Sequence, residues 1–125
     1  MSASENKAMV RRYLDAINGK DKPASVLSHY IADSDQALFE HIASAESAFP
    51  HYELIAEDLI AEDDKVVVRF TWRATHRGNF MGIPATDKQI AVPGLIIYQI
   101  AQGKITNHWL QVDSAALMQQ LVPKP

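Results

Sequence analysis

The stretch VVVRFTWRATH, residues 66–76, alternates apolar and polar side chains over most of its length. A period of two is the pattern of a β-strand with one buried face. One side of this strand would carry Val66, Val68, Phe70, Trp72, Ala74 and His76. The other side would carry Arg69, Thr71, Arg73 and Thr75. We therefore expect a strand whose last inward residue, His76, lies at the rim of whatever its apolar face covers.

Further strands are expected on both sides of this one. Residues 51–62 lead into it through an acidic turn at Glu62-Asp63-Asp64. Residues 89–100, QIAVPGLIIYQI, are apolar on both faces, which predicts burial on both. Gly94, next to Pro93, is expected to mark a bulge or a sharp bend. Residues 105–113, ITNHWLQVD, predict the last strand.

The N-terminal half has helical periodicity instead. Residues 4–19 place apolar side chains on one face, with a possible capping box at Ser2 and Glu5 and a stop at Gly19. Two more helices are expected, around 24–31 and over 35–48, and a terminal helical turn over 114–122. Helices followed by antiparallel strands predict one α+β domain, residues 1–125. In this arrangement the helices pack on one face of a bent sheet, which can leave a cavity.

Composition narrows the possible functions. The chain has 125 residues, a formal net charge of −3, and no basic cluster suited to a phosphate backbone, so nucleic acid is not expected as a partner. The absence of cysteine excludes disulfides and thiolate chemistry. The N-terminus does not resemble a signal peptide, and no apolar run is long enough to cross a bilayer. We therefore expect a cytoplasmic protein without a membrane segment.

Three residues are candidates for proton transfer. His76 is either a pocket residue or a hydrogen-bonded histidine at the sheet edge. His108 and Asp113 lie in the last expected strand, where ideal alternation places them on opposite faces. On pattern alone, Asp113 is better explained as the N-cap of the terminal helix, because aspartate is favoured there. No spacing of histidines and carboxylates indicates a metal site, and no phosphate-binding or hydrolase motif is present.

A second group of residues could line a binding pocket. The aromatic and apolar members have a simpler explanation as core or hairpin residues, and the histidine could be a half-buried surface residue. Any buried tyrosine among them needs a partner for its hydroxyl. The candidates are Tyr13, His41, Trp72, Phe80, Met81, Tyr98 and Trp109.

Several segments taken together resemble the SnoaL-like polyketide cyclases, also called predicted ester cyclases, of the nuclear transport factor 2-like superfamily. The matching pieces are Phe49-Pro50, AEDDKVVVR, THRGNFMGIPATDK, IIYQIAQGKI, HWLQVD and LMQQL, which span about the C-terminal two-thirds of the chain. Asp87 stands where the family has a glycine. The resemblance implies a cone-shaped, cystatin-like fold, with the N-terminal helices in the concavity of a curved, mostly antiparallel sheet.

The resemblance also has consequences for function. Asp113 falls on the acid/base residue of the characterised cyclases, and His76 and His108 fall on histidines of the family motifs. A cofactor-free cyclase or isomerase is implied, in which a base removes a proton next to a carbonyl and the enolate closes a ring. The expected partner is a small apolar or aromatic carbonyl compound. Alternatives are a binder of apolar ligands, or dehydration, isomerisation or epoxide hydrolysis on the same scaffold.

The composition of residues 89–99 also bears on assembly. One set of its apolar side chains can line the cone, and the other set needs a cover that so short a chain has few elements left to provide. We therefore expect a homodimer formed through a face of the sheet.

Overall fold

Helices precede strands along the chain, as the sequence predicts. The computed structural model describes residues 2–122. Its elements are α1 (Ala3–Ile17), α2 (Ala24–Leu27), α3 (Gln36–Ala48), β1 (Glu53–Glu62), β2 (Lys65–Thr75), β3 (Gln89–Ala101), β4 (Lys104–Val112) and α4 (Ser114–Leu121). Within this part of the chain, no helix is long and apolar enough to cross a membrane.

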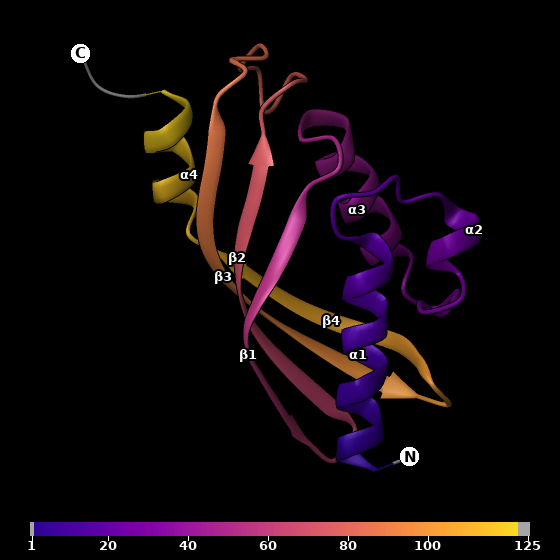
Figure 1. Ribbon diagram of the computed structural model, residues 1–125. Helices are drawn as coiled ribbons and strands as arrows, with labels where there is room; N and C mark the ends of the chain where they lie inside the picture. The colour runs from indigo at the N-terminus through magenta and orange to yellow at the C-terminus, as the bar shows by residue number, and fades with distance from the viewer. Residues whose placement is uncertain (1, 123–125) are drawn as a thin grey trace.

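The four strands form one antiparallel sheet in the order β1-β2-β3-β4. The sheet is strongly curved, and α1 and α3 lie on its concave side (Figure 1). Register shifts occur between Ala56 and Asp58 in β1 and between Gln99 and Ile100 in β3. The predicted α+β architecture, with helices in the concavity of a curved antiparallel sheet, is confirmed.

Gly94 has a different role from the expected bulge. The pairing of β2 with β3 runs through Pro93 and Gly94 without a register shift. A Cβ atom at Gly94 would lie 2.5 Å from Cζ of Phe70 and 2.9 Å from the carbonyl oxygen of Gln111. Glycine is therefore required here because the Phe70 ring and the β4 backbone approach the β3 backbone closely.

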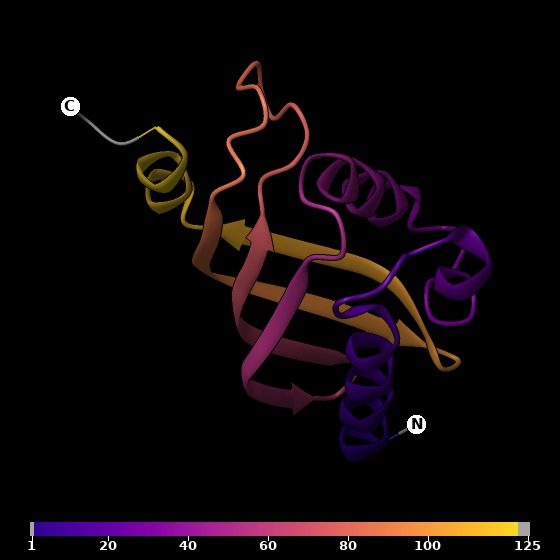
Figure 2. The ribbon, with the colours of Figure 1, turned by 45° about the horizontal axis from the view of Figure 1, so that its top comes forward.

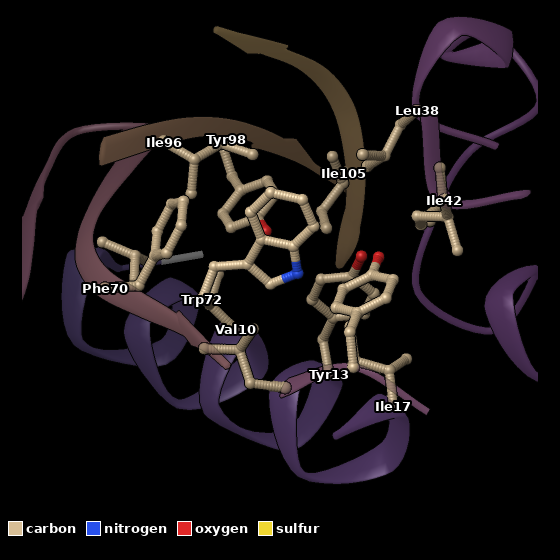
Figure 3. Packing of buried hydrophobic residues seen from close by; sticks show 14 of the residues in the cluster. Val10, Tyr13, Ile17, Leu38, Ile42, Phe70, Trp72, Ile96, Tyr98 and Ile105 are labelled. Atoms are coloured by element: carbon tan, nitrogen blue, oxygen red, sulfur yellow. The ribbon is translucent and has the colours of Figure 1, made fainter. Parts of the chain in front are cut away.

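The core fills the space between α1 and the concave face of the sheet. One face of α1 is buried through Met9, Val10, Tyr13, Leu14 and Ile17, as its periodicity predicts. The inward residues of β2 and β3 meet this face, and Figure 3 shows the packing. Burying this much apolar surface is the main stabilising contribution to a domain of this size.

Local hydrogen bonds fix where α1 begins and where it meets the sheet. The predicted capping box is present: the Ser2 hydroxyl accepts from the Glu5 amide at 3.1 Å, and the Ser2 amide donates to the Glu5 carboxylate at 3.0 Å. At the other end, the Asn18 side chain exchanges two hydrogen bonds of 2.9 Å with the backbone of Leu54 in β1. These contacts set the position of α1 across the sheet.

The second helix is shorter than predicted. It ends at Leu27, although the apolar pattern continues to Ile31. Instead, Ile31 forms a parallel bridge with Ile105, and the backbone of Tyr30 and Ala32 bonds that of Ile105. One further hydrogen-bonded turn follows the helix, in which the Ile31 amide donates to the Leu27 carbonyl at 2.8 Å. The chain then pairs with the start of β4, which brings residues 31–35 beside β4.

The two faces of β3 are unequally covered. Ile90, Val92, Ile96, Tyr98 and Ile100 are buried on the concave side. The opposite side is exposed or half-buried, with Leu95 at 48% exposure. The prediction that β3 is buried on both faces is therefore wrong for a single chain. Near the start of β3, the Gln120 side chain of α4 forms hydrogen bonds with both the amide and the carbonyl of Ala91, at 2.8 and 2.9 Å.

Candidate active site

A cavity of about 460 Å³ lies between the concave face of the sheet and the helices. Side chains from α1, α3, α4 and all four strands form its wall, and its size suits a small organic molecule. The lining includes Tyr13, Leu38, His41, Ile42, Ala45, Tyr52, Leu54, Phe70, Trp72, Phe80, Met81, Ile96, Tyr98, Leu110, Val112, Leu117 and Met118. No Asp, Glu, Lys or Arg among residues 2–122 lines it. The cavity therefore favours an uncharged, largely apolar ligand.

The loop after β2 forms part of the wall. Phe80 and Ile83 exchange backbone hydrogen bonds of 2.9 and 2.8 Å, and the Phe80 ring packs on Phe49 at 5.3 Å. Met81, at the tip, is 82% exposed and still contributes to the lining. Figure 2 shows this loop standing above the sheet, with α3 on one side of it and α4 on the other. Phe80 and Met81 thus lie at the cavity mouth.

A buried acid–histidine pair adjoins the cavity. The Nδ1 atom of His108 lies 2.7 Å from Oδ2 of Asp35, and the two side chains are 7% and 4% exposed. The other carboxylate oxygen, Oδ1, accepts from the Leu38 amide at 3.2 Å and caps α3. Asp35 was not predicted as a site residue from the sequence. Its position before an apolar helix marks it as a cap, but nothing local indicates a partner 73 positions away.

The register of β4 places His108 on the cavity side. Leu110 and Val112, two and four residues further along, line the cavity, and residues of this parity share a face. Across the ladder, His108 is paired with Tyr98, which also lines the cavity. Its ring meets that of His41 edge-on, with 5.5 Å between centroids. His108 itself is not one of the lining residues, but it lies on the inner face of β4 beside the lining residues His41, Tyr98 and Leu110.

Tyr13 and Tyr98 are two of the polar residues in the cavity lining, which also include Ser44, Tyr52 and Ser114. Both are fully buried, their rings meet edge-on at 5.7 Å, and Figure 3 shows them beside Trp72. Burial raises the pKa of the Tyr98 phenol far above its ordinary value, and burial together with the neighbouring Tyr98 does the same for the pKa of Tyr13. Both hydroxyls are therefore neutral hydrogen-bond donors at physiological pH.

Asp113 occupies the helix-cap position that its sequence context favours. Its Oδ1 accepts from the Ala116 amide at 2.9 Å, and the residue is exposed. Its neighbours Val112 and Ser114 line the cavity, whereas Asp113 itself does not. The carboxylate thus lies at the edge of the cavity and not inside it.

His76 is buried more deeply than a rim position implies. It has 0% exposure and packs against the Phe49 ring at 5.2 Å. Its Nδ1 lies 2.9 Å from the Thr86 hydroxyl and 3.3 Å from the Thr86 amide, which donates to it. Its backbone bonds Asp87 and Lys88. His76 therefore holds the two ends of the loop over residues 77–88 together, behind the cavity wall.

The two tryptophans are separated by the sheet. Trp72 is 8% exposed and lines the cavity, where it packs on Phe49 at 4.9 Å. Trp109 is 47% exposed and lies on the opposite face of β4 from His108. Of the pocket residues proposed from sequence, Tyr13, His41, Trp72, Phe80, Met81 and Tyr98 are brought together, and Trp109 is not.

A second hollow of about 900 Å³ is more open and lies elsewhere. It is lined by His51, Glu53, Arg73, Arg77 and Gln120, among others. The Arg73, Arg77 and His51 side chains are exposed to solvent, and the ion pair between the lining residues Arg73 and Glu53 is 3.8 Å long. Exposed charges of this kind are strongly solvated. The smaller, apolar cavity is therefore the better candidate for chemistry.

Comparison with known proteins concerns the family and the fold of this chain. The family model for SnoaL-like polyketide cyclase matches residues 24–121. The chain belongs to this family. SnoaL-like members share the nuclear transport factor 2-like fold, and the curved sheet with its helix-lined cavity is that fold. Among proteins with curated functions, none matches this chain closely enough to count as a relative.

Solved structures give the same fold. AclR from Streptomyces galilaeus, a proposed hydroxylase, superposes with a TM-score of 0.85 at 24% identity, covering 99% of this chain and 86% of its own. A proposed SnoaL-like polyketide cyclase from Jannaschia sp. CCS1 gives 0.85 at 21% identity, with 98% and 95% covered. TsrD from Streptomyces laurentii gives 0.83 at 24% identity, with 99% of each chain covered. Because these structures are only 21–24% identical to this SnoaL-like chain, their similarity to it shows a shared fold and nothing more.

Proposed function

We propose that this SnoaL-like protein is a cofactor-free enzyme that cyclises or isomerises a small carbonyl compound by acid/base chemistry. The observation that carries the proposal is the apolar cavity, whose lining holds tyrosines, two serines and one histidine, with the buried Asp35–His108 pair next to it. An apolar site with a few converging polar groups is the usual form of a small-molecule active site.

The proposed reaction is an intramolecular aldol cyclisation. A base removes a proton from the carbon next to one carbonyl, and the resulting enolate attacks a second carbonyl of the same molecule. Asp113, His108 and His76 are the sequence-derived candidates for the proton transfers, and the Tyr98 hydroxyl can donate to the enolate oxygen. The cavity holds the two reacting carbons close together, which replaces an encounter in solution.

Two alternatives use the same cavity. A binder of apolar ligands would need the lining but no proton transfer. Dehydration, double-bond isomerisation or epoxide hydrolysis would use the same acid/base groups on a different substrate. The buried acid–histidine pair favours an enzyme over a binder, because burying two ionisable groups costs stability that ligand binding alone does not require.

Exchange of carbon-bound protons tests the proposal without knowledge of the natural substrate. Small aromatic ketones are first screened for binding by thermal shift, and bound ketones are then followed by proton NMR in D₂O. We expect the protein to accelerate replacement of the α-protons by deuterium. Ketones that bind without faster exchange would support the non-catalytic binder.

A pair of variants on one helix controls for the location of the reaction. Ala45→Trp fills the cavity from α3, and Ala43→Trp places the same side chain on the exposed side of that helix. Ala45→Trp should abolish both ketone binding and exchange, and Ala43→Trp should preserve both. Equal activity in the two variants would place the reaction outside the cavity.

We also propose that the functional unit is a homodimer joined through the outer face of the sheet. Support comes from the uncovered apolar side chains on that face, which include Leu95 and Trp109 at 48% and 47% exposure. Exposed apolar area of this kind is typical of an interface between subunits.

A further inference from the structure

We propose that the proton-transferring atom of this site is Nε2 of His108, and that Asp35 is the residue that positions it. This assignment rests on the proposed acid/base function and replaces Asp113 as the base. It follows from the hydrogen bonding of Asp35, from the orientation of His108 and from the surroundings of the other candidates.

The Asp35 carboxylate determines which ring nitrogen of His108 carries a proton. An ionised carboxylate only accepts hydrogen bonds, so the Nδ1 atom at 2.7 Å from Oδ2 must donate. In the neutral ring, Nε2 is then unprotonated and has a free lone pair. The second oxygen of Asp35 is held by the Leu38 amide, which fixes the carboxylate on α3. The pair is therefore oriented before any substrate arrives.

The position of His108 lets this lone pair reach a bound molecule. His108 shares the inner face of β4 with Leu110 and Val112, and it is paired with Tyr98 across the ladder. All three of these neighbours line the cavity. Because Nδ1 is directed to Asp35 on the helix side, Nε2 is the nitrogen left for the cavity. A base here and a hydroxyl donor at Tyr98 would lie on adjacent strands.

The other two candidates are engaged elsewhere. Asp113 is exposed, and its Oδ1 accepts from the Ala116 amide to cap α4. His76 uses Nδ1 to hold Thr86 and packs under Phe49. None of the three candidates is itself a lining residue, and only His108 combines a buried partner carboxylate with a place on the inner face of β4, between strand neighbours that line the cavity.

The proton and electron balance is complete within the site. Nε2 takes the α-proton, which leaves an imidazolium on His108 and an enolate on the substrate. The enolate carbon forms a bond to the second carbonyl carbon, and the electron pair moves to that oxygen. The imidazolium returns its proton to this alkoxide. Asp35 stays ionised throughout and stabilises the imidazolium, as a buried carboxylate does for a catalytic histidine.

The first experiment measures the tautomer of His108. Long-range ¹⁵N–¹H NMR of the imidazole rings should show His108 protonated at Nδ1 in the wild-type protein. In Asp35→Asn, which can still cap α3, the preference for that tautomer should be lost. The control is the exposed pair His51–Asp21, 2.6 Å apart on the surface, where Asp21→Asn should leave His108 unchanged. A wild-type His108 protonated only at Nε2 would overturn the proposal.

The second experiment measures α-proton exchange in a bound aromatic ketone. His108→Gln should lower the exchange rate by about a hundred- to ten-thousand-fold. Asp35→Asn should lower the rate as well, without weakening ketone binding, because the carboxylate does not touch the ligand. His108→Asn serves as a second variant if His108→Gln does not fold. His51→Gln should exchange at the wild-type rate.

The outcomes separate this assignment from the proposed function. Exchange that persists in both His108 variants would overturn the role of His108 and leave the enzyme proposal standing. Loss of exchange in Asp113→Asn, with His108→Gln active, would return the role of base to Asp113. Wild-type protein that binds ketones without exchanging them would overturn the enzyme proposal and the role of His108 together.

Discussion

Asp35 uses its two carboxylate oxygens for two tasks at once. Oδ1 caps α3, and Oδ2 accepts from His108, so the start of a helix and the wall of the cavity are joined through one side chain. Removing this carboxylate would leave a buried imidazole N–H without an acceptor, which costs about 1–3 kcal/mol. The same carboxylate therefore serves both the helix cap and the contact with His108, which is why a residue whose sequence context indicates only a cap is also part of the buried pair.

The buried tyrosines predict how stability depends on pH. Burial raises the pKa values of Tyr13, Tyr52 and Tyr98 in the folded protein. A raised folded-state pKa contributes stability that is fully present below the unfolded value, about 10, and is lost as pH rises beyond it. Above pH 10 each tyrosine should therefore lower the free energy of unfolding by about 1.4 kcal/mol per pH unit.

Urea denaturation of the wild type and Tyr98→Phe, at several pH values from 7 to 11, measures this effect. The variant should lose no more than about 1 kcal/mol at pH 7, because the substitution removes only one buried hydroxyl group. Above pH 10 its free energy of unfolding should fall less steeply than that of the wild type. Parallel curves for the two proteins would show that Tyr98 ionises as readily when folded as when unfolded.

At the scale of elements, periodicity and local caps could be predicted from the sequence. The stripe on α1, its capping box, and the alternation in β2 are all properties of neighbouring residues, and each was found where expected. The end of α2 could not be predicted, because Ile31 pairs with Ile105 far along the chain. The Asp35–His108 contact was missed for the same reason: it depends on how α3 lies against β4.

The helix α4 allows the structural role of Asp113 to be measured separately from catalysis. Its carboxylate caps α4 through the Ala116 amide, and asparagine is an equally good N-cap. Asp113→Asn should therefore keep the free energy of unfolding within about 0.5 kcal/mol of wild type, whereas Asp113→Ala should lose about 1 kcal/mol. Chemical denaturation at neutral pH measures both. Equal losses in the two variants would mean that the charge, and not the cap, stabilises this helix.

At the scale of the whole molecule, the outer face of the sheet is the largest feature that one chain leaves unexplained. The strand registers align Ile60 with Val67, Val67 with Ile97, and Ile97 with Trp109. These four side chains form one apolar row across all four strands, and Ile60 and Trp109 are 63% and 47% exposed. The same strands carry the cavity on their other face, so a partner here would stiffen the wall that holds Tyr98 and His108.

Light scattering tests whether a second copy covers this row. Wild-type protein at micromolar concentration should have the mass of two 13.9 kDa chains. Ile97→Lys places a charge in the middle of the row, where a dimer would have to bury it unpaired, so this variant should be monomeric. Ala43→Lys, on the exposed side of α3, adds the same charge away from the sheet and should remain dimeric. A monomeric wild type, or an Ile97→Lys variant that stays dimeric, would rule out this face as the interface.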